Sequence, residues 1–113
     1  MNLFDSVLKI ARGGKLVSSY CKNCDKYIWP PKQFCNYCNL AVSFKDVKRE
    51  GIVLVKGYSN LQGKKRPFAI GEFDGIRIIG SINDDIVIGE SIIMSEIRVT
   101  NGRLDIKFVS NST

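Results

Sequence analysis

The chain of 113 residues has room for one ordinary domain or two very small ones, and it carries a formal net charge of +6 with no histidine. A chain this short buries only about two-thirds of its unfolded surface, so a subdomain within it needs a cross-link. The 44% of hydrophobic residues excludes a disordered tail, and no apolar run approaches the length of a membrane span.

The segment 1–14 predicts an amphipathic helix that ends at Gly13-Gly14. Its apolar residues at helical spacing are Phe4, Val7, Leu8 and Ala11. Asp5 and Lys9 lie among them, which is not the order of a signal peptide. We therefore expect a cytoplasmic protein without a membrane anchor. The apolar face of the helix is expected to pack on its own domain, with docking to a partner as the alternative.

Four cysteines form the motif with the clearest chemistry. Cys21 and Cys24 are separated by two residues, as are Cys35 and Cys38, and ten residues separate the pairs. This spacing is typical of two turns that each direct two thiolates at one tetrahedral ion. A reducing cytosol favours a metal site over two disulfides. Zinc is the expected ion because of its availability and structural precedent, although a rubredoxin-type iron site uses the same ligands.

Residues around the cysteines support this metal site. Asp25 and Asn39 follow the second cysteine of each pair, where the backbone is often left-handed, and Asp and Asn tolerate that conformation best among non-glycine residues. A site with four thiolates is coordinatively closed, so its metal organises the fold and activates no water. Four thiolates and one divalent ion together lower the net charge of the chain from +6 to about +4.

Two groups of side chains are expected to surround the ion. The aromatic residues of the segment 27–31, which contains two prolines, predict an extended cover over the metal site. The cations Lys22, Lys26 and Lys32 are expected to offset the negative charge of the thiolates.

After Cys38 the pattern changes to β-strands, which we expect over residues 52–58, 68–73, 76–82, 93–99 and 104–108. Asp74-Gly75 and Asn101-Gly102 predict two-residue type I′ hairpins. Residues 59–67 are expected to form a polar loop. The glycines expected at bends or bulges of a small barrel are Gly57, Gly71, Gly80 and Gly89.

Five strands with two tight hairpins fit a Greek-key barrel of the oligonucleotide/oligosaccharide-binding (OB) type, although other small barrels fit too. The segment 83–89 is too short and turn-rich for the helix that usually joins the third and fourth strands. The predicted fold is therefore mainly β, with a helix over 1–14, a metal-binding segment over 15–44 and a barrel over 45–113.

Two stretches of the sequence carry a family resemblance that covers nearly the whole chain. The first stretch begins with Leu16–Tyr20. It then contains the two cysteine motifs, Cys21-x-x-Cys24 and Trp29-Pro30-Pro31-x-x-x-Cys35-x-x-Cys38. The second comprises the strand segments 67–73, 75–80 and 88–92. The chain resembles the rubredoxin-like zinc-ribbon plus OB-fold family of acyl-CoA-associated proteins. It departs from that family by lacking the glycines that often follow the cysteine pairs.

This resemblance implies a non-catalytic accessory or scaffold subunit that forms a hetero-oligomer with a thiolase-like acyl-CoA enzyme. In archaeal complexes of this kind, such a protein bridges acetoacetyl-CoA thiolase and hydroxymethylglutaryl-CoA synthase, and acyl-CoA binding has been inferred for the fold. The residues also argue against an enzyme, because histidine is absent and all four thiols are assigned to the metal. The carboxylates Asp74, Asp84 and Asp85 are interpreted as turn residues.

The basic cluster Lys64-Lys65-Arg66 predicts a ligand site beside the first two barrel strands. It would bind the phosphates of CoA or of a nucleic acid, with Tyr58 or Phe68 available for stacking. A solvated loop is the alternative interpretation. The alternative function is therefore a single-stranded nucleic-acid-binding protein. Against it, aromatic and basic residues do not alternate along one strand face.

Overall fold

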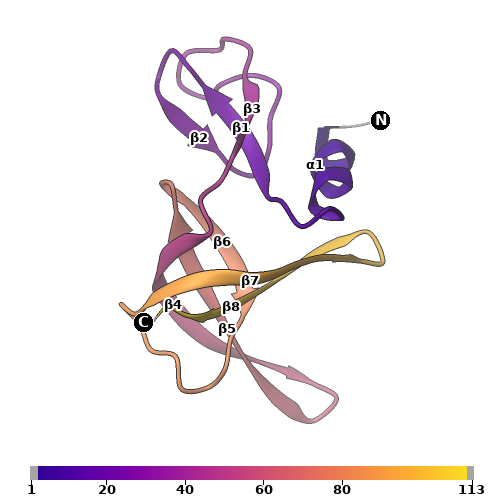
Figure 1. The fold of residues 1–113 in the computed structure, drawn as a ribbon, viewed down its shortest axis with the longest axis vertical. Helices are drawn as coiled ribbons and strands as arrows, with labels where there is room; N and C mark the ends of the chain where they lie inside the picture. Colours follow the sequence, from indigo (N-terminus) through magenta and orange to yellow (C-terminus); the bar gives the residue numbers. More distant parts are fainter. Residues whose placement is uncertain (1–2, 112–113) are drawn as a thin grey trace.

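The computed structural model describes residues 3–111 and shows a small sheet above a closed barrel, with the helix beside the junction (Figure 1). The helix α1 covers Leu3–Ala11. The small sheet contains β1 (Val17–Cys21), β2 (Lys26–Ile28) and β3 (Ser43–Asp46). The barrel contains β4 (Glu50–Leu61), β5 (Lys64–Phe73), β6 (Ile76–Ser81), β7 (Ser91–Thr100) and β8 (Arg103–Ser110).

The predicted N-terminal helix is confirmed. Val7, Leu8 and Ala11 are buried, and Ala11 belongs to the main core of the barrel. The helix packs on β1, β7 and β8 of its own chain, as expected for its apolar face, although the side chain of Phe4 lies outside the described part. Among residues 3–111 there is no helix with the length and hydrophobicity that crossing a bilayer requires.

Two buried serines of β1 bond the end of β2 and the segment that follows it. The sheet has the order β2-β1-β3 with antiparallel pairs. Ser18 donates its hydroxyl hydrogen to the carbonyl of Ile28 (2.6 Å), and Ser19 bonds both backbone groups of Lys32 (2.7 and 2.9 Å). Because buried polar groups need such partners, these contacts hold the chain after β2 against β1. The sheet continues to Asp46, two residues beyond the expected segment 15–44.

The barrel strands have the order β4-β5-β6-β8-β7, and β7 returns to β4 to close the barrel. All pairs are antiparallel except β6 with β8, which meet at Ser81 and Lys107. This confirms the expected closed five-stranded barrel. Residues 83–89 form turns and no helix, also as expected. Fully buried barrel side chains include Val53, Ala69, Phe73, Ile92, Met94 and Phe108.

Both predicted hairpin turns are confirmed by left-handed backbone angles at Asp74-Gly75 (φ 51° and 84°) and Asn101-Gly102 (52° and 75°). The predicted polar loop over 59–67 is wrong. Gln62 and Gly63 form a third turn of the same kind (φ 54° and 78°), so β4 and β5 stay paired as far as Leu61 and Lys64. The polar side chains do not prevent pairing because the strands extend beyond the barrel into solvent.

One of the glycines expected at bends or bulges adjoins a bulge. The register shifts lie between Val53 and Val55 and between Met94 and Glu96, and Gly71 pairs with Val53 at the first of them. Gly57 and Gly80 lie in regular pairs. Gly57, Gly71 and Gly80 all make room for aromatic rings. A Cβ atom there would meet ring carbons of Phe68, Phe73 and Phe108, respectively, at 2.6–2.7 Å. The bulge in β7 also interrupts the alternation of buried and exposed residues. Ile92 and Met94 are buried before it, and Ile97 is buried after it.

Candidate metal centre

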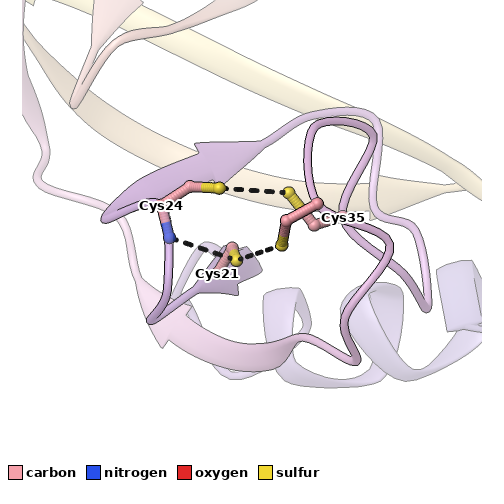
Figure 2. A group of neighbouring side chains, drawn as sticks. Cys21, Cys24 and Cys35 are labelled. Atoms are coloured by element: carbon pink, nitrogen blue, oxygen red, sulfur yellow. Dashed lines mark hydrogen bonds between the residues drawn. The ribbon is translucent and has the colours of Figure 1, made fainter.

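Each cysteine pair lies in a turn in which a backbone N–H group donates a hydrogen bond to a cysteine sulfur. Asp25 and Asn39 have φ angles of 54° and 63°, which confirms the predicted left-handed positions. The backbone N–H of Cys24 donates to the Sγ of Cys21 (3.4 Å; Figure 2). In the second turn, the N–H of Tyr37 donates to the Sγ of Cys35 (3.3 Å). Such donors stabilise thiolates in the geometry of a metal ligand.

The four sulfur atoms have the separations that a tetrahedral ion requires. They all lie within 4.8 Å of one another, with 3.5 Å between Cys21 and Cys38 and 3.9 Å between Cys24 and Cys35. A regular tetrahedron with metal–sulfur bonds of about 2.3 Å has edges of about 3.8 Å. Figure 2 shows the sulfurs of Cys21, Cys24 and Cys35 turned toward one another. These cysteines therefore form a site for one metal ion, as predicted.

The apolar shell of this site is small. Cys21 and Cys35 are buried together with Ile28, and Val42 packs against them. The prediction that aromatic side chains cover the site is wrong. Tyr27 and Trp29 pack against the barrel core instead, because the segment after β2 turns toward the junction between the sheet and the barrel. With so few apolar contacts, the metal-binding unit depends on its ion for stability.

The local environment favours one thiolate and disfavours another. The hydrogen bond with Cys38 and then burial raise the pKa of Cys24 to about 12. The backbone N–H of Leu40 lowers the pKa of Cys38 to about 7, because it bonds the charged form of the thiol. Two of the lysines expected to offset the thiolates contact side chains of the second cysteine turn. Lys26 lies over the ring of Tyr37 (4.5 Å to its centroid), and Lys32 donates to the side chain of Asn36 (3.2 Å).

Two of the carboxylates interpreted from the sequence as turn residues form structural contacts within the fold. Asp84 accepts a hydrogen bond from the hydroxyl of Tyr58 (2.5 Å) and pairs with the ammonium of Lys56 (3.4 Å). These contacts hold the segment after β6 against β4. Asp74 accepts the backbone N–H of Lys48 (2.7 Å) and so connects a barrel turn to the chain that leaves β3.

These contacts predict a pH dependence at Asp84. Its pKa lies below the ordinary value of 3.8, because the Tyr58 hydroxyl and then Lys56 stabilise the carboxylate. The stabilisation is therefore complete above that ordinary value and is lost as the pH falls through the lower pKa of the folded state. An NMR titration should find a higher Asp84 pKa in Tyr58→Phe than in the parent. Equal values would show that the hydroxyl does not act on this carboxylate.

The structure separates the five residues of the predicted ligand site. Residues directly opposite in an antiparallel pair point to the same face. Tyr58 is opposite Pro67, and Ser59 is opposite Arg66. Tyr58 and Lys65 therefore share one face, whereas Lys64, Arg66 and Phe68 lie on the other. Sequence reasoning placed the three basic residues in a loop between Tyr58 and Phe68, because it missed the turn at Gln62-Gly63.

Arg66 and Phe68 line a groove of about 650 Å³ on the outer face of the barrel. Ile79 of β6 and Arg98, Arg103 and Lys107 of β7 and β8 also line it. Sequence reasoning missed these last four residues. The signal available was the alternation of charged and apolar residues in β7 and β8, which places charges on the outer face but does not show which strand they approach.

Comparisons with known proteins agree with this geometry. Residues 9–41 match the sequence family described as "ChsH2, rubredoxin-like zinc ribbon domain". The structure is similar to "Ltp2-ChsH2(DUF35) aldolase", with a TM-score of 0.82 and 17% sequence identity over 99% of this chain and 98% of that chain. The chain has the zinc-ribbon and barrel fold of the DUF35 proteins. The resemblance stated from the sequence is thus confirmed for the ribbon segment and for the fold.

A second solved structure shares the DUF35 fold. It is a DUF35-family protein of unknown function from Sulfolobus solfataricus, with a TM-score of 0.65 and 15% identity over 91% of this chain and 82% of that one. No curated protein sequence matches the chain. At these identities the two structures show the fold, with the ribbon formed by β1–β3 and the barrel by β4–β8.

Proposed function

We propose that this chain is a non-catalytic accessory subunit of an acyl-CoA-processing complex. In this role it would hold a thiolase-like enzyme in a hetero-oligomer, as the family resemblance implies. The solved structure with the same fold is named as an Ltp2-ChsH2 aldolase, which pairs a DUF35 protein with a second protein. The observation that carries the proposal is a set of exposed apolar side chains on both units of the molecule.

The ribbon exposes apolar side chains beside its metal site. Phe34, Tyr37 and Leu40, here called the ribbon patch, are 57%, 68% and 52% exposed. All three belong to the second cysteine turn, where the N–H of Cys35 bonds the carbonyl of Leu40 (2.9 Å). The metal site thus orders a loop that presents large apolar groups to solvent, which is a feature of protein interaction surfaces.

The barrel exposes a second apolar set, here called the barrel patch, which consists of Ile52, Val55, Val87 and Ile88. The bulge after Val53 places Ile52 and Val55 on the outside of β4. Gly89 and Glu90 bond the backbone of Val53 (2.8 and 3.0 Å), so the segment with Val87 and Ile88 lies beside β4. Patches on two separate units suit a subunit that contacts more than one surface of a complex.

The chemistry of the side chains supports a non-catalytic role. The chain has no histidine, and its four thiols converge on one metal position that leaves no open coordination site. Asp74 and Asp84 form contacts that stabilise the fold. For a ligand, we propose that Lys64, Arg66 and Phe68 bind the phosphates and adenine of acyl-CoA. Tyr58 and Lys65, on the other strand face, do not take part. Single-stranded nucleic acid is the second candidate for this basic face.

Affinity capture of the full-length chain from native extract tests this function. We expect a thiolase-like enzyme to be recovered at a fixed stoichiometry. Tyr37→Asp and Ile88→Asp should each reduce the recovery of this enzyme by about tenfold, because each places a carboxylate without a partner in an apolar contact. Asn36→Asp and Asn83→Asp are the matched controls, since they add the same charge beside each patch. Recovery of RNA that is lost at high salt, without an acyl-CoA enzyme, would instead support a nucleic-acid-binding protein.

A further inference from the structure

Two long hairpins project beyond the barrel wall and border the groove that contains Arg66 and Phe68. One is the end of β4–β5 around Gln62-Gly63, and the other is the end of β7–β8 around Asn101-Gly102. Figure 1 shows both hairpins extending toward the same side of the barrel. The groove between them has a volume of about 650 Å³, and Ile79 of β6 lies in its floor with 61% exposure.

The groove contains backbone edges without strand partners. Between β6 and β8 the described residues form one ladder pair, Ser81 with Lys107. Residues 103–105 of β8 therefore pair with β7 on one side only, whereas the carbonyl of Ile106 accepts the hydroxyl of Ser81 (3.5 Å). In β5, residues 64–66 likewise pair with β4 but not with β6, whereas the carbonyl of Pro67 accepts the N–H of Ile82 after β6 (3.4 Å). Such edges offer alternating donors and acceptors to another extended polypeptide.

The side chains that surround these edges are mainly basic. Arg66, Arg103 and Lys107 line the groove, and the ion pairs that the described residues form with one another give none of them an acidic partner. Arg98 is compensated, because it pairs with Glu96 (3.2 Å) and lies opposite Asp105. Lys107 likewise lies opposite Glu96. The groove thus combines two cations without a cross-strand carboxylate, Arg66 and Arg103, with an apolar floor.

We propose that this groove binds an extended acidic segment of a partner protein, which adds as a strand to the free edge of β8. Its carboxylates would meet Arg66 and Arg103 on the outer face, and every second side chain would point to the inner face, on which Leu104 packs against the core. This is the alternation that a β-strand provides. The inference rests on the proposed function in assigning the segment to a partner subunit, and it names the chemistry of that segment. Because both ligands use Arg66 and Phe68, the acidic segment and acyl-CoA would compete for this groove.

The groove fits a peptide better than a nucleic acid for two reasons. A phosphate backbone cannot use the unpaired N–H and C=O groups as a ladder, whereas a peptide backbone bonds to both kinds. Phe68 is the one aromatic residue among the lining side chains. A single-strand binder of this size relies on several stacked bases and a continuous basic track.

The test uses the purified full-length chain and a fluorescein-labelled ten-residue peptide of alternating Glu and Val. We expect salt-sensitive binding by fluorescence anisotropy, weakened about tenfold or more in the double variant Arg66→Glu/Arg103→Glu. Lys65→Glu is the matched control, because it reverses a neighbouring charge on the opposite face of β5. It should change the affinity less than about twofold. Backbone amide shifts in NMR spectra should be concentrated at residues 103–105.

Each other outcome contradicts the proposal. Equal binding of a Lys/Val peptide, no binding of the Glu/Val peptide, or equal losses in Lys65→Glu would exclude an acidic strand in this groove. Tighter binding of a ten-nucleotide thymidine oligomer would assign the groove to nucleic acid. If the peptide does not bind but a thiolase-like enzyme is captured, this inference fails alone. If the peptide binds but no acyl-CoA enzyme is captured, the proposed function fails alone.

Discussion

Replacing Cys24 with serine is expected to abolish stoichiometric metal binding and to unfold the ribbon while the barrel remains folded. Cys24 supplies one of four converging sulfurs, and the shell around them is limited to a few side chains such as Ile28 and Val42. Structural zinc contributes roughly 10–16 kcal/mol to the folding of comparable small units, which exceeds what such a small core can supply. The barrel has its own closed sheet and core, so it should not depend directly on the ion.

Metal analysis and hydrogen exchange measure the two parts of this expectation. The parent should contain about one zinc per chain, and Cys24→Ser far less. Amides over 17–46 should lose protection in the variant, whereas those in β4–β8 keep it. Asn23→Ser is the control, because it changes an exposed residue in the same turn that is not a ligand. A variant that still holds one zinc, or an iron-containing parent, would contradict the assignment.

Replacing Phe73 with alanine is expected to destabilise the barrel by about 3–5 kcal/mol. The Phe73 ring is fully buried, and its centroid lies 5.2 Å from that of Phe108. Because domains of this size have total stabilities of about 5–15 kcal/mol, this loss is a large fraction of the whole. Urea unfolding followed by circular dichroism measures it. Phe68→Ala is the control, since that ring is only half-buried on the outer face, and it should cost less than about 1.5 kcal/mol.

A double-mutant cycle with Gly71 tests the cause of this effect. A Cβ atom at Gly71 would lie 2.7 Å from the Phe73 ring, so Gly71→Ala should destabilise the parent by about 1–3 kcal/mol. In the Phe73→Ala background the ring is absent, and the added methyl group occupies part of the cavity. The cost of Gly71→Ala should then be small or reversed. Additive effects would show that the glycine serves another purpose than accommodating the ring.

Local chemistry allowed much of the fold to be predicted. The cysteine spacing identified the four ligands, and Asp25 and Asn39 were recognised as left-handed because few residue types tolerate that conformation. Asp74-Gly75 and Asn101-Gly102 marked hairpins for the same reason. Gln62-Gly63 forms an equivalent turn but was missed, since glutamine is not a typical residue for it and the polar neighbours imitate a loop.

The face of the sheet on which each side chain lies was the least predictable feature. A shift of one residue in a strand moves every following side chain to the other face. The turn at Gln62-Gly63 decides that Arg66 and Phe68 point away from Tyr58. The bulge before Glu96 decides that Met94 and Ile97 both enter the core. Neither event has a sequence signal as strong as a cysteine pair or an Asn-Gly turn.

The sequence by itself determined the metal ligands, the N-terminal helix, two hairpins and the count of barrel strands, because each depends on residues close together in the chain. Only the tertiary structure decided that Arg66, Ile79 and Arg103 border one groove, that Trp29 packs on the barrel, and that Ile52 and Ile88 are exposed. These facts depend on barrel closure and register. Both depend on contacts between segments that are distant in the sequence. Local sequence patterns do not indicate the free energies of such contacts.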